Sequence, residues 1–176
     1  FNKLAALNIP TVAAIHGAAV GGGYEVALAC DWRVASPDSS TKIGLPETQL
    51  GIIPAWGGST RLPRLIGVPG ALDIILGGKT VAAKHALKLG MVDEVAPRGS
   101  LLAAARVWLK KGKRGHDLAH SAPVNAAVDF MIAPRVRHQV EDRTHGHYPA
   151  VQKAMEVVME GASDWNEAKS LARERA

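Results

Sequence analysis

The eleven residues 15–25, IHGAAVGGGYE, join two different kinds of local structure. Before them, the apolar and partly β-branched run 11–15 follows Pro10 and predicts a buried strand. After the glycines, the apolar segment 24–30 predicts a buried helix. Backbone N–H groups at such a glycine-rich helix start can meet a ligand oxygen, and the helix dipole adds positive potential. The G-x-G-x-x-G spacing of a dinucleotide site is absent, so close helix–strand contact is an equal explanation of the triplet.

Outward from this stretch, short strands and helices alternate up to residue 97, and helical patterns follow. Besides the first strand and helix, we expect strands at 31–36 and 91–95, an extended segment at 43–47, and helices through 62–66, at 69–76 and at 82–89. Beyond residue 97, helical spacing predicts helices at 101–111, 123–132, 150–160 and 164–175. The sequence therefore predicts an α/β core over 1–97 and a helical extension over 98–176.

Composition excludes several classes of protein. The chain has 176 residues, of which 47% are apolar and 21% charged, enough to bury a core and too apolar for a disordered tail. Its one cysteine, Cys30, cannot form an internal disulfide, which favours a reducing compartment. No run approaches the roughly 20 apolar residues of a membrane span, so we expect no membrane helix.

The net charge of +5 comes from two late basic clusters, at 110–114 and 135–138. Neither cluster has interleaved aromatic residues for base stacking, and no nucleic-acid module accompanies them. We therefore expect no nucleic-acid partner. A solvated face explains the clusters, and an anionic small molecule such as a phosphorylated cofactor is the alternative.

The candidate catalytic features are two glutamates and a second glycine turn. Glu25 stands in the first turn of an otherwise apolar helix, and Glu47 is predicted on the extended segment after Pro46. Two neighbouring carboxyl groups can divide acid and base roles, because a like charge raises the pKa of one partner. A second glycine turn, 54–59, also precedes a helix, so its N–H groups add a place for charge that develops on an oxygen.

Three segments make the chain recognisable: IHGAAVGGGYE (15–25), GLPETQLGIIP (44–54) and WGGSTRLPR (56–64). They resemble the oxyanion and catalytic segments of the crotonase (enoyl-CoA hydratase/isomerase) superfamily. The LPET form and the YPA at 148–150 look most like the hydratase part of bifunctional fatty-acid β-oxidation α-subunits, in which a 3-hydroxyacyl-CoA dehydrogenase follows. The resemblance implies a crotonase-type ββα spiral whose N-terminal strands are missing, followed by a helical region.

The resemblance also implies roles for single residues. Glu25 matches the glutamate that activates water, Glu47 matches the one that gives a proton to the α-carbon, and the Gly22 N–H matches an oxyanion donor. Together they imply hydration of trans-2-enoyl-CoA to 3-hydroxyacyl-CoA. The further residues expected to bind the oxyanion or substrate are Gly21, Gly23, Ala55, Trp56 and Gly57. Ala55 departs from the family pattern, which usually has glycine there, but its N–H is retained.

Two alternatives stay open. One is an isomerase or other crotonase chemistry on a CoA thioester, and the other is a non-catalytic module for CoA binding or oligomerisation. Because the family's N-terminal strands and its other oxyanion N–H precede the segment that this chain contains, we expect the chain alone to lack hydratase activity.

Partners and cofactors follow from the same resemblance. Hydration needs no bound cofactor; the substrate carries coenzyme A, and NAD is implied only if a dehydrogenase domain follows. The family habit implies a homo-oligomer, commonly a trimer, or a thiolase partner subunit in a larger complex. No metal is expected, since the pairs His116/His120 and His145/His147 lack a carboxylate or cysteine in ligand spacing. A cytoplasmic location is expected for a bacterial protein, or an organellar matrix for a eukaryotic one.

Overall fold

The structure, a computed structural model, describes residues 1–114, 138, 148–163 and 166–174. Within these residues the strands form two small sheets. The first sheet is parallel and has the order β1 (Val12–Ile15), β3 (Trp32–Ala35), β6 (Glu94–Val95). The second has the order β2 (Ala18–Val20), β4 (Lys42–Gly44), β5 (Thr80–Ala82), with β2 and β4 parallel and β5 antiparallel to β4.

The first four strands alternate between the two sheets. β1 lies in the first sheet, and after a turn at Gly17, where φ is +79°, β2 lies in the second. β3 and β4 repeat this step, so Ile15 pairs with Ala35 in one sheet and Val20 with Gly44 in the other. A helix follows each strand pair. This repeated strand–strand–helix unit confirms the α/β class and agrees with the expected ββα spiral.

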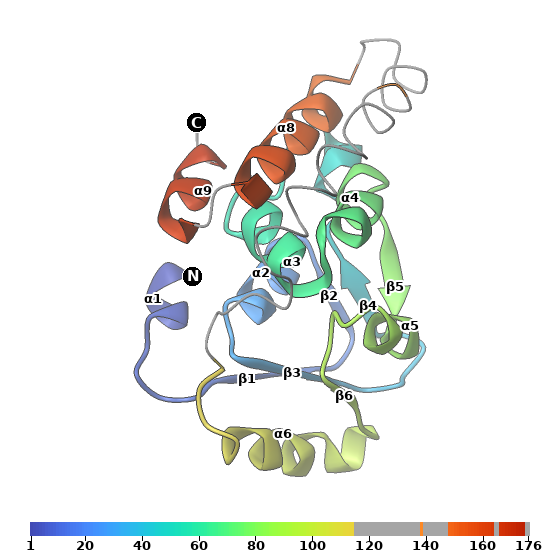
Figure 1. The fold of residues 1–176 in the computed structure, drawn as a ribbon. Helices are drawn as coiled ribbons and strands as arrows, with labels where there is room; N and C mark the ends of the chain where they lie inside the picture. Colours follow the sequence, from blue (N-terminus) through green and yellow to red (C-terminus); the bar gives the residue numbers. More distant parts are fainter. Residues whose placement is uncertain (115–137, 139–147, 164–165, 175–176) are drawn as a thin grey trace.

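The helices cover the sheets from several sides (Figure 1). α6 packs on β1 and β3, and Figure 1 shows α2 and α3 on the opposite side of these strands. Within the described residues the helices are α1 (Asn2–Ala5), α2 (Gly22–Leu28), α3 (Gly58–Ile66), α4 (Val68–Leu76), α5 (Ala83–Lys88), α6 (Leu101–Leu109), α8 (Pro149–Ser163) and α9 (Glu167–Arg173), with 3-10 turns η1 (Glu47–Leu50) and η2 (Arg98–Ser100).

The main core joins both ends of the chain. Fully buried side chains of α2, β4 and α3, such as Tyr24, Ile43 and Leu62, lie in one cluster with Ala154 and Val158 of α8. Burying a side chain of this kind contributes about 1.5–3 kcal/mol. Tyr24 also donates its hydroxyl to the Met91 carbonyl at 2.9 Å, which satisfies its one buried polar atom. α2 is therefore held on several sides by core contacts.

Part of the basic cluster 110–114 is bound within the fold. The Lys113 ammonium lies 3.6 Å from the buried Asp31 carboxylate, and Arg114 donates to Asp93 at 2.7 Å. These ion pairs join the segment after α6 to the residues that directly precede β3 and β6. Two of the charges considered for a phosphorylated small molecule therefore have partners inside this chain.

Most expected elements are confirmed, within a few residues at each end. One expectation is wrong: Glu47 does not lie on an extended segment, because β4 ends at Gly44 and Glu47 begins the 3-10 turn η1. The short strands β2 and β5 were not expected, because three-residue strands carry too little alternation to be detected. The expected helix 123–132, residues 135–137 of the second basic cluster and both histidine pairs lie outside the described residues.

The division of the chain at residue 97 stays a prediction. In the structure α6 packs on the first sheet, while α8 packs on α3 and α4, so helices from beyond residue 97 contact the α/β core. None of the helices in the described part of the chain is long and apolar enough to cross a membrane.

The contact between β4 and β5 requires a glycine at position 44. A Cβ there would lie 2.0 Å from the Lys79 carbonyl oxygen, a backbone atom. We expect Gly44→Ala to lower the free energy of unfolding by roughly 1–3 kcal/mol, as overpacking does elsewhere, measured by urea denaturation. Gly99→Ala is the control, since a Cβ at that position meets no described atom within 4 Å. Equal stability of the two variants would contradict this account.

Candidate active site

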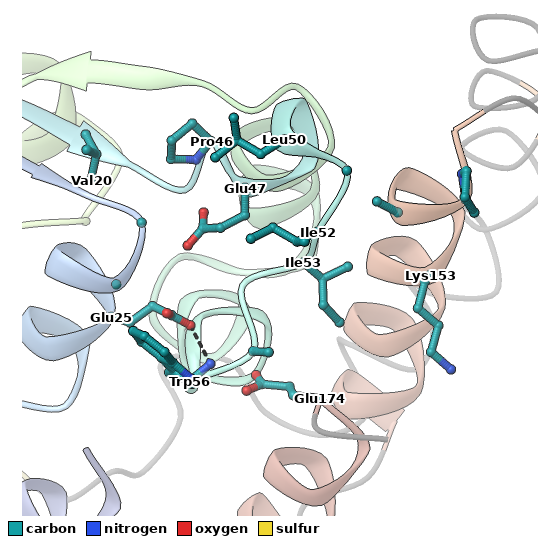
Figure 2. Close-up of a pocket in the computed structure, with 16 residues that line it drawn as sticks. Val20, Glu25, Pro46, Glu47, Leu50, Ile52, Ile53, Trp56, Lys153 and Glu174 are labelled. Atoms are coloured by element: carbon teal, nitrogen blue, oxygen red, sulfur yellow. Dashed lines mark hydrogen bonds between the residues drawn. The ribbon is translucent and has the colours of Figure 1, made fainter.

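A pocket of about 850 Å³ lies where α2, the segment 46–56, α8 and the end of α9 meet (Figure 2). Its size suits a small-molecule ligand. Its wall is mostly apolar, and three carboxyl side chains project into it. The lining residues are Val20, Gly21, Gly22, Glu25, Pro46, Glu47, Leu50, Gly51, Ile52, Ile53, Ala55, Trp56, Pro149, Ala150, Lys153 and Glu174.

Glu25 is buried in the first turn of α2 and held by backbone donors of another element. Its side chain is 2% exposed, and its Oε1 accepts hydrogen bonds from the N–H groups of Trp56 and Gly58, both at 2.8 Å. Burial raises the pKa of Glu25, while these two N–H groups and the nearby Arg61 guanidinium oppose the rise. The two N–H donors thus fix the carboxyl group in position and offset part of the cost of burying its charged form.

Glu47 is placed differently, at the start of η1 on the opposite side of the pocket. Its residue is 8% exposed, and its Oε2 has no hydrogen-bond partner among the described residues. Burial raises the pKa of Glu47 to about 7; its own backbone N–H opposes this rise, and the charge of Glu25 adds to it. Figure 2 shows the Glu25 and Glu47 carboxyl groups turned toward the same space.

The first glycine turn is shaped by its neighbours in this pocket. Gly21 has φ +55°, and a Cβ there would lie 3.1 Å from Glu47 Oε1. A Cβ on Gly22 would lie 2.9 Å from the Trp56 ring, so only glycine fits beneath that ring. Gly22 begins α2, and the first N–H groups of a helix have no partner within it. Gly23 differs, because it does not line the pocket and a Cβ there would meet no described atom within 4 Å.

The second glycine turn supplies the donors that hold Glu25. Trp56 contributes its N–H to this carboxylate, and its side chain, 64% exposed, lies at the pocket wall edge-on to Phe1 at 5.6 Å between ring centroids. Ala55 also lines the pocket. Gly57 does not line the pocket. Its φ is +116°, and a Cβ there would overlap the Arg61 guanidinium, so the fold requires glycine at this position.

Sequence reasoning missed the third carboxyl group and much of the apolar wall. Glu174 is the residue that directly follows α9 and lines the pocket. In the sequence it belongs to the polar face of a helical pattern. The apolar wall comes from the loop after η1 and from the start of α8, including Ile52, Ile53 and Ala150. The YPA segment at 148–150 did mark the start of α8. Nothing in the local pattern marks Glu174, because its place depends on contacts with residues more than a hundred positions earlier.

The arrangement suits paired acid and base chemistry on a neutral or anionic ligand. One carboxyl group accepts two backbone N–H hydrogen bonds, which favour its charged form, and the pKa of the other is raised to about 7. Such a difference between neighbouring carboxyl groups marks a base and an acid. Helix-start N–H groups beside them can stabilise charge on an oxygen. Among the described residues there is no cluster of three His, Cys, Asp or Glu side chains that could hold a metal ion.

Comparison with known proteins agrees with this geometry. The chain is 46% identical over 167 residues to the fatty acid oxidation complex subunit alpha of Shewanella baltica (strain OS155 / ATCC BAA-1091), covering 92% of this chain and 24% of that protein. The corresponding subunit of Shewanella putrefaciens (strain CN-32 / ATCC BAA-453) gives the same identity and coverage. The chain therefore spans about a quarter of the length of these curated relatives.

Solved structures agree as well. An enoyl-CoA hydratase from Bacillus anthracis superposes with a TM-score of 0.58 at 32% identity, covering 98% of this chain and 54% of that chain. Pseudomonas aeruginosa DspI superposes with a TM-score of 0.57 at 39% identity, covering 61% of this chain and 43% of that chain. Residues 1–170 match the model of the family described as enoyl-CoA hydratase/isomerase, and the chain belongs to that family.

Proposed function

We propose that this chain carries the acid–base site of an enoyl-CoA hydratase, which adds water to a trans-2-enoyl-CoA to give a 3-hydroxyacyl-CoA. The observation that carries the proposal is the pair of buried glutamates in one apolar pocket, Glu25 held by two N–H donors and Glu47 retaining its proton. Membership of the enoyl-CoA hydratase/isomerase family supports the same reaction. The names of the curated relatives support a role in fatty-acid oxidation.

In the proposed reaction the two glutamates act on opposite ends of the double bond. Charged Glu25 accepts a proton from water as the water oxygen bonds to the β-carbon. Protonated Glu47 gives its proton to the α-carbon. After product leaves, Glu25 releases its proton to solvent and Glu47 takes one up, so the net change is addition of one water molecule. Glu25 can act as the base because its second oxygen remains free to face the pocket while Oε1 is held by Trp56 and Gly58.

The thioester oxygen gains negative charge while the water adds. We propose that the Gly22 N–H at the start of α2 binds this oxygen, with Gly21 and Trp56 shaping the space around it. Removing one donor of this kind typically costs about 100-fold or more in rate. The apolar wall at Ile52 and Ile53 suits the hydrocarbon part of the acyl group.

The proposal extends to the cofactors, partners and location of the protein. Hydration uses no resident cofactor, the substrate brings coenzyme A, and NAD belongs only to a dehydrogenase domain elsewhere in a longer protein. A homo-oligomer or a thiolase partner subunit, in the cytoplasm of a bacterium, would match the subunit names of the curated relatives.

The two glutamates are separable by substitution in the natural full-length protein. We expect Glu25→Gln and Glu47→Gln each to lower kcat for hydration of crotonyl-CoA by roughly 100- to 10,000-fold, because each removes one proton transfer. Loss of absorbance of the conjugated thioester measures the rate. Glu156→Gln on the exposed side of α8 is the matched control and should keep its activity.

The same variants separate hydration from isomerisation. Migration of the double bond in a 3-enoyl-CoA needs one carboxylate that takes a proton from the α-carbon and returns it to the γ-carbon. It can therefore persist through the charged form of Glu47 in Glu25→Gln. A hydratase that keeps full activity without the Glu25 carboxyl group would refute the proposed role.

The pH dependence follows from the state of Glu47. Its pKa is raised to about 7, so it is protonated below that pH and loses its proton above it. Because hydration needs the proton, kcat/KM for hydration should fall as pH rises through about 7. Dehydration of 3-hydroxybutyryl-CoA uses the same single proton of the pair, placed on Glu25 instead of Glu47. Because the overall reaction takes up and releases no proton, its kcat/KM should fall in parallel with that of hydration. Initial rates in both directions between about pH 5.5 and about pH 9 test this, and a kcat/KM for hydration that stays constant through pH 7 would contradict it.

A further inference from the structure

The pocket contains a third buried carboxyl group that the proposed reaction does not use. Glu174 is 3% exposed and lines the same pocket as Glu25 and Glu47. Neither of its oxygens has a hydrogen-bond partner among the described residues. In Figure 2 its side chain extends from the end of α9 toward the turn that carries Trp56. A buried carboxyl group without partners is costly in its charged form, so its presence here calls for a physical role.

Glu174 lies beside the same helix start that holds Glu25. Two N–H groups of this turn, those of Trp56 and Gly58, bind Glu25. The polar groups nearest Glu174 are the backbone N–H groups of Gly57 and Thr60 and the Thr60 hydroxyl. That hydroxyl is also buried and has no hydrogen-bond partner among the described residues. Two carboxyl groups therefore flank the positive end of α3, where a helix stabilises about half a unit of negative charge.

The surrounding cations are engaged elsewhere. On α3, the Arg61 Nε lies 3.2 Å from Glu167, and Arg64 donates to the Thr60 carbonyl at 2.9 Å and to the Ser170 hydroxyl at 3.0 Å. On α8, Lys153 is exposed, and Figure 2 shows it turned away from the carboxyl groups. The charged side chains of the pocket and of the neighbouring helices α3, α8 and α9, apart from Glu174 itself, are Glu25, Glu47, Arg61, Arg64, Lys153, Glu156, Glu160, Glu167, Lys169 and Arg173.

This environment favours the neutral form of Glu174. The pKa of Glu174 is raised to about 7, chiefly by burial and also by the charge of Glu25. The Thr60 hydroxyl and the N–H groups of Gly57 and Thr60 oppose this rise. Glu25 is then the only one of these two carboxyl groups whose negative charge the start of α3 has to stabilise. If Glu174 ionised, two negative charges would share that helix start, and a third would form on the thioester oxygen during hydration.

We propose, on the basis of the hydratase function above, that Glu174 is a positioning residue that acts through Glu25 and the α3 helix start. Its neutral form leaves the α3 dipole and N–H donors to the base. Its ionised form places an extra negative charge in the pocket and opposes formation of the enolate. Glu174 thereby makes hydration fall more steeply at alkaline pH than the loss of the Glu47 proton alone would cause.

The kinetic test compares E174Q with wild type and with E156Q, in the natural full-length protein and with crotonyl-CoA. Glutamine keeps the shape of the side chain and removes its ionisation. Below pH 7 the three proteins should have similar kcat/KM. At alkaline pH, E174Q should retain on the order of tenfold more of its activity than wild type, the size expected from one extra charge in a partly buried site. Superimposable pH profiles for E174Q and wild type would overturn the proposal.

A second measurement does not depend on turnover. Infrared difference spectroscopy follows the carbonyl stretch of protonated carboxyl groups as pH changes. The experiment is done in the E47Q background, because Glu47 titrates in the same range and also feels the charge of Glu25. E47Q should show a carboxyl group that titrates near neutral pH and is absent from the E47Q/E174Q double variant. In E25Q/E47Q this titration should move to lower pH, because the neighbouring charge is gone. An unmoved titration in E25Q/E47Q would overturn the coupling between Glu174 and Glu25.

These readouts distinguish the two proposals. Absence of crotonyl-CoA hydration by wild type, together with the expected infrared shifts, would refute the hydratase function and leave the paired carboxyl groups at α3 established. Normal hydration with superimposable pH profiles would refute only the role of Glu174. If E174Q fails to fold, the titrations of E47Q and E25Q/E47Q still decide the coupling.

Discussion

The site depends on one interaction, the pair of hydrogen bonds by which the backbone N–H groups of Trp56 and Gly58 hold the Glu25 carboxylate at 2.8 Å. A carboxylate in an apolar helix is costly to bury unless such donors compensate it. Here the donors lie at the start of α3, whose dipole adds to their effect. The same contact joins α2 to α3, so it orients the base and fixes the pocket wall together.

Around that contact, glycines of both turns leave room for a neighbouring side chain. Gly22 lies under the Trp56 ring, Gly21 faces Glu47, and Gly57 makes room for the Arg61 guanidinium. Arg61 in turn donates to Asn2 of α1 at 2.8 Å and lies near Glu167 of α9. The two ends of the described chain therefore meet behind the turn that holds the base.

The pocket separates three chemically identical side chains by environment. Glu25 has two backbone donors, whereas Glu47 and Glu174 are buried with unpartnered oxygens among the described residues. Since burial favours the neutral form and N–H donors favour the charged one, the same residue type can act as base, as acid or as a neutral neighbour. Local hydrogen bonding, more than residue identity, assigns these roles.

Much of this could be predicted from the sequence. The glycine triplet, Glu25 in a first helical turn and the second glycine turn are local patterns, as are the strands β1 and β3. The three-residue strands β2 and β5 and the η1 turn at Glu47 could not be predicted, because their conformation depends on pairing and burial rather than on periodicity.

By itself, the sequence determined the family and the two candidate carboxylates, since both rest on short contiguous motifs. Only the tertiary structure decided that Glu47 faces Glu25, that Gly23 and Gly57 lie outside the pocket wall, and that Glu174 enters it. The physical reason is that each placement depends on contacts between segments that are distant in the chain. β2 pairs with β4 just before Glu47, α2 packs on α3, and α9 folds back on α3 across about a hundred residues, and no local pattern encodes these contacts.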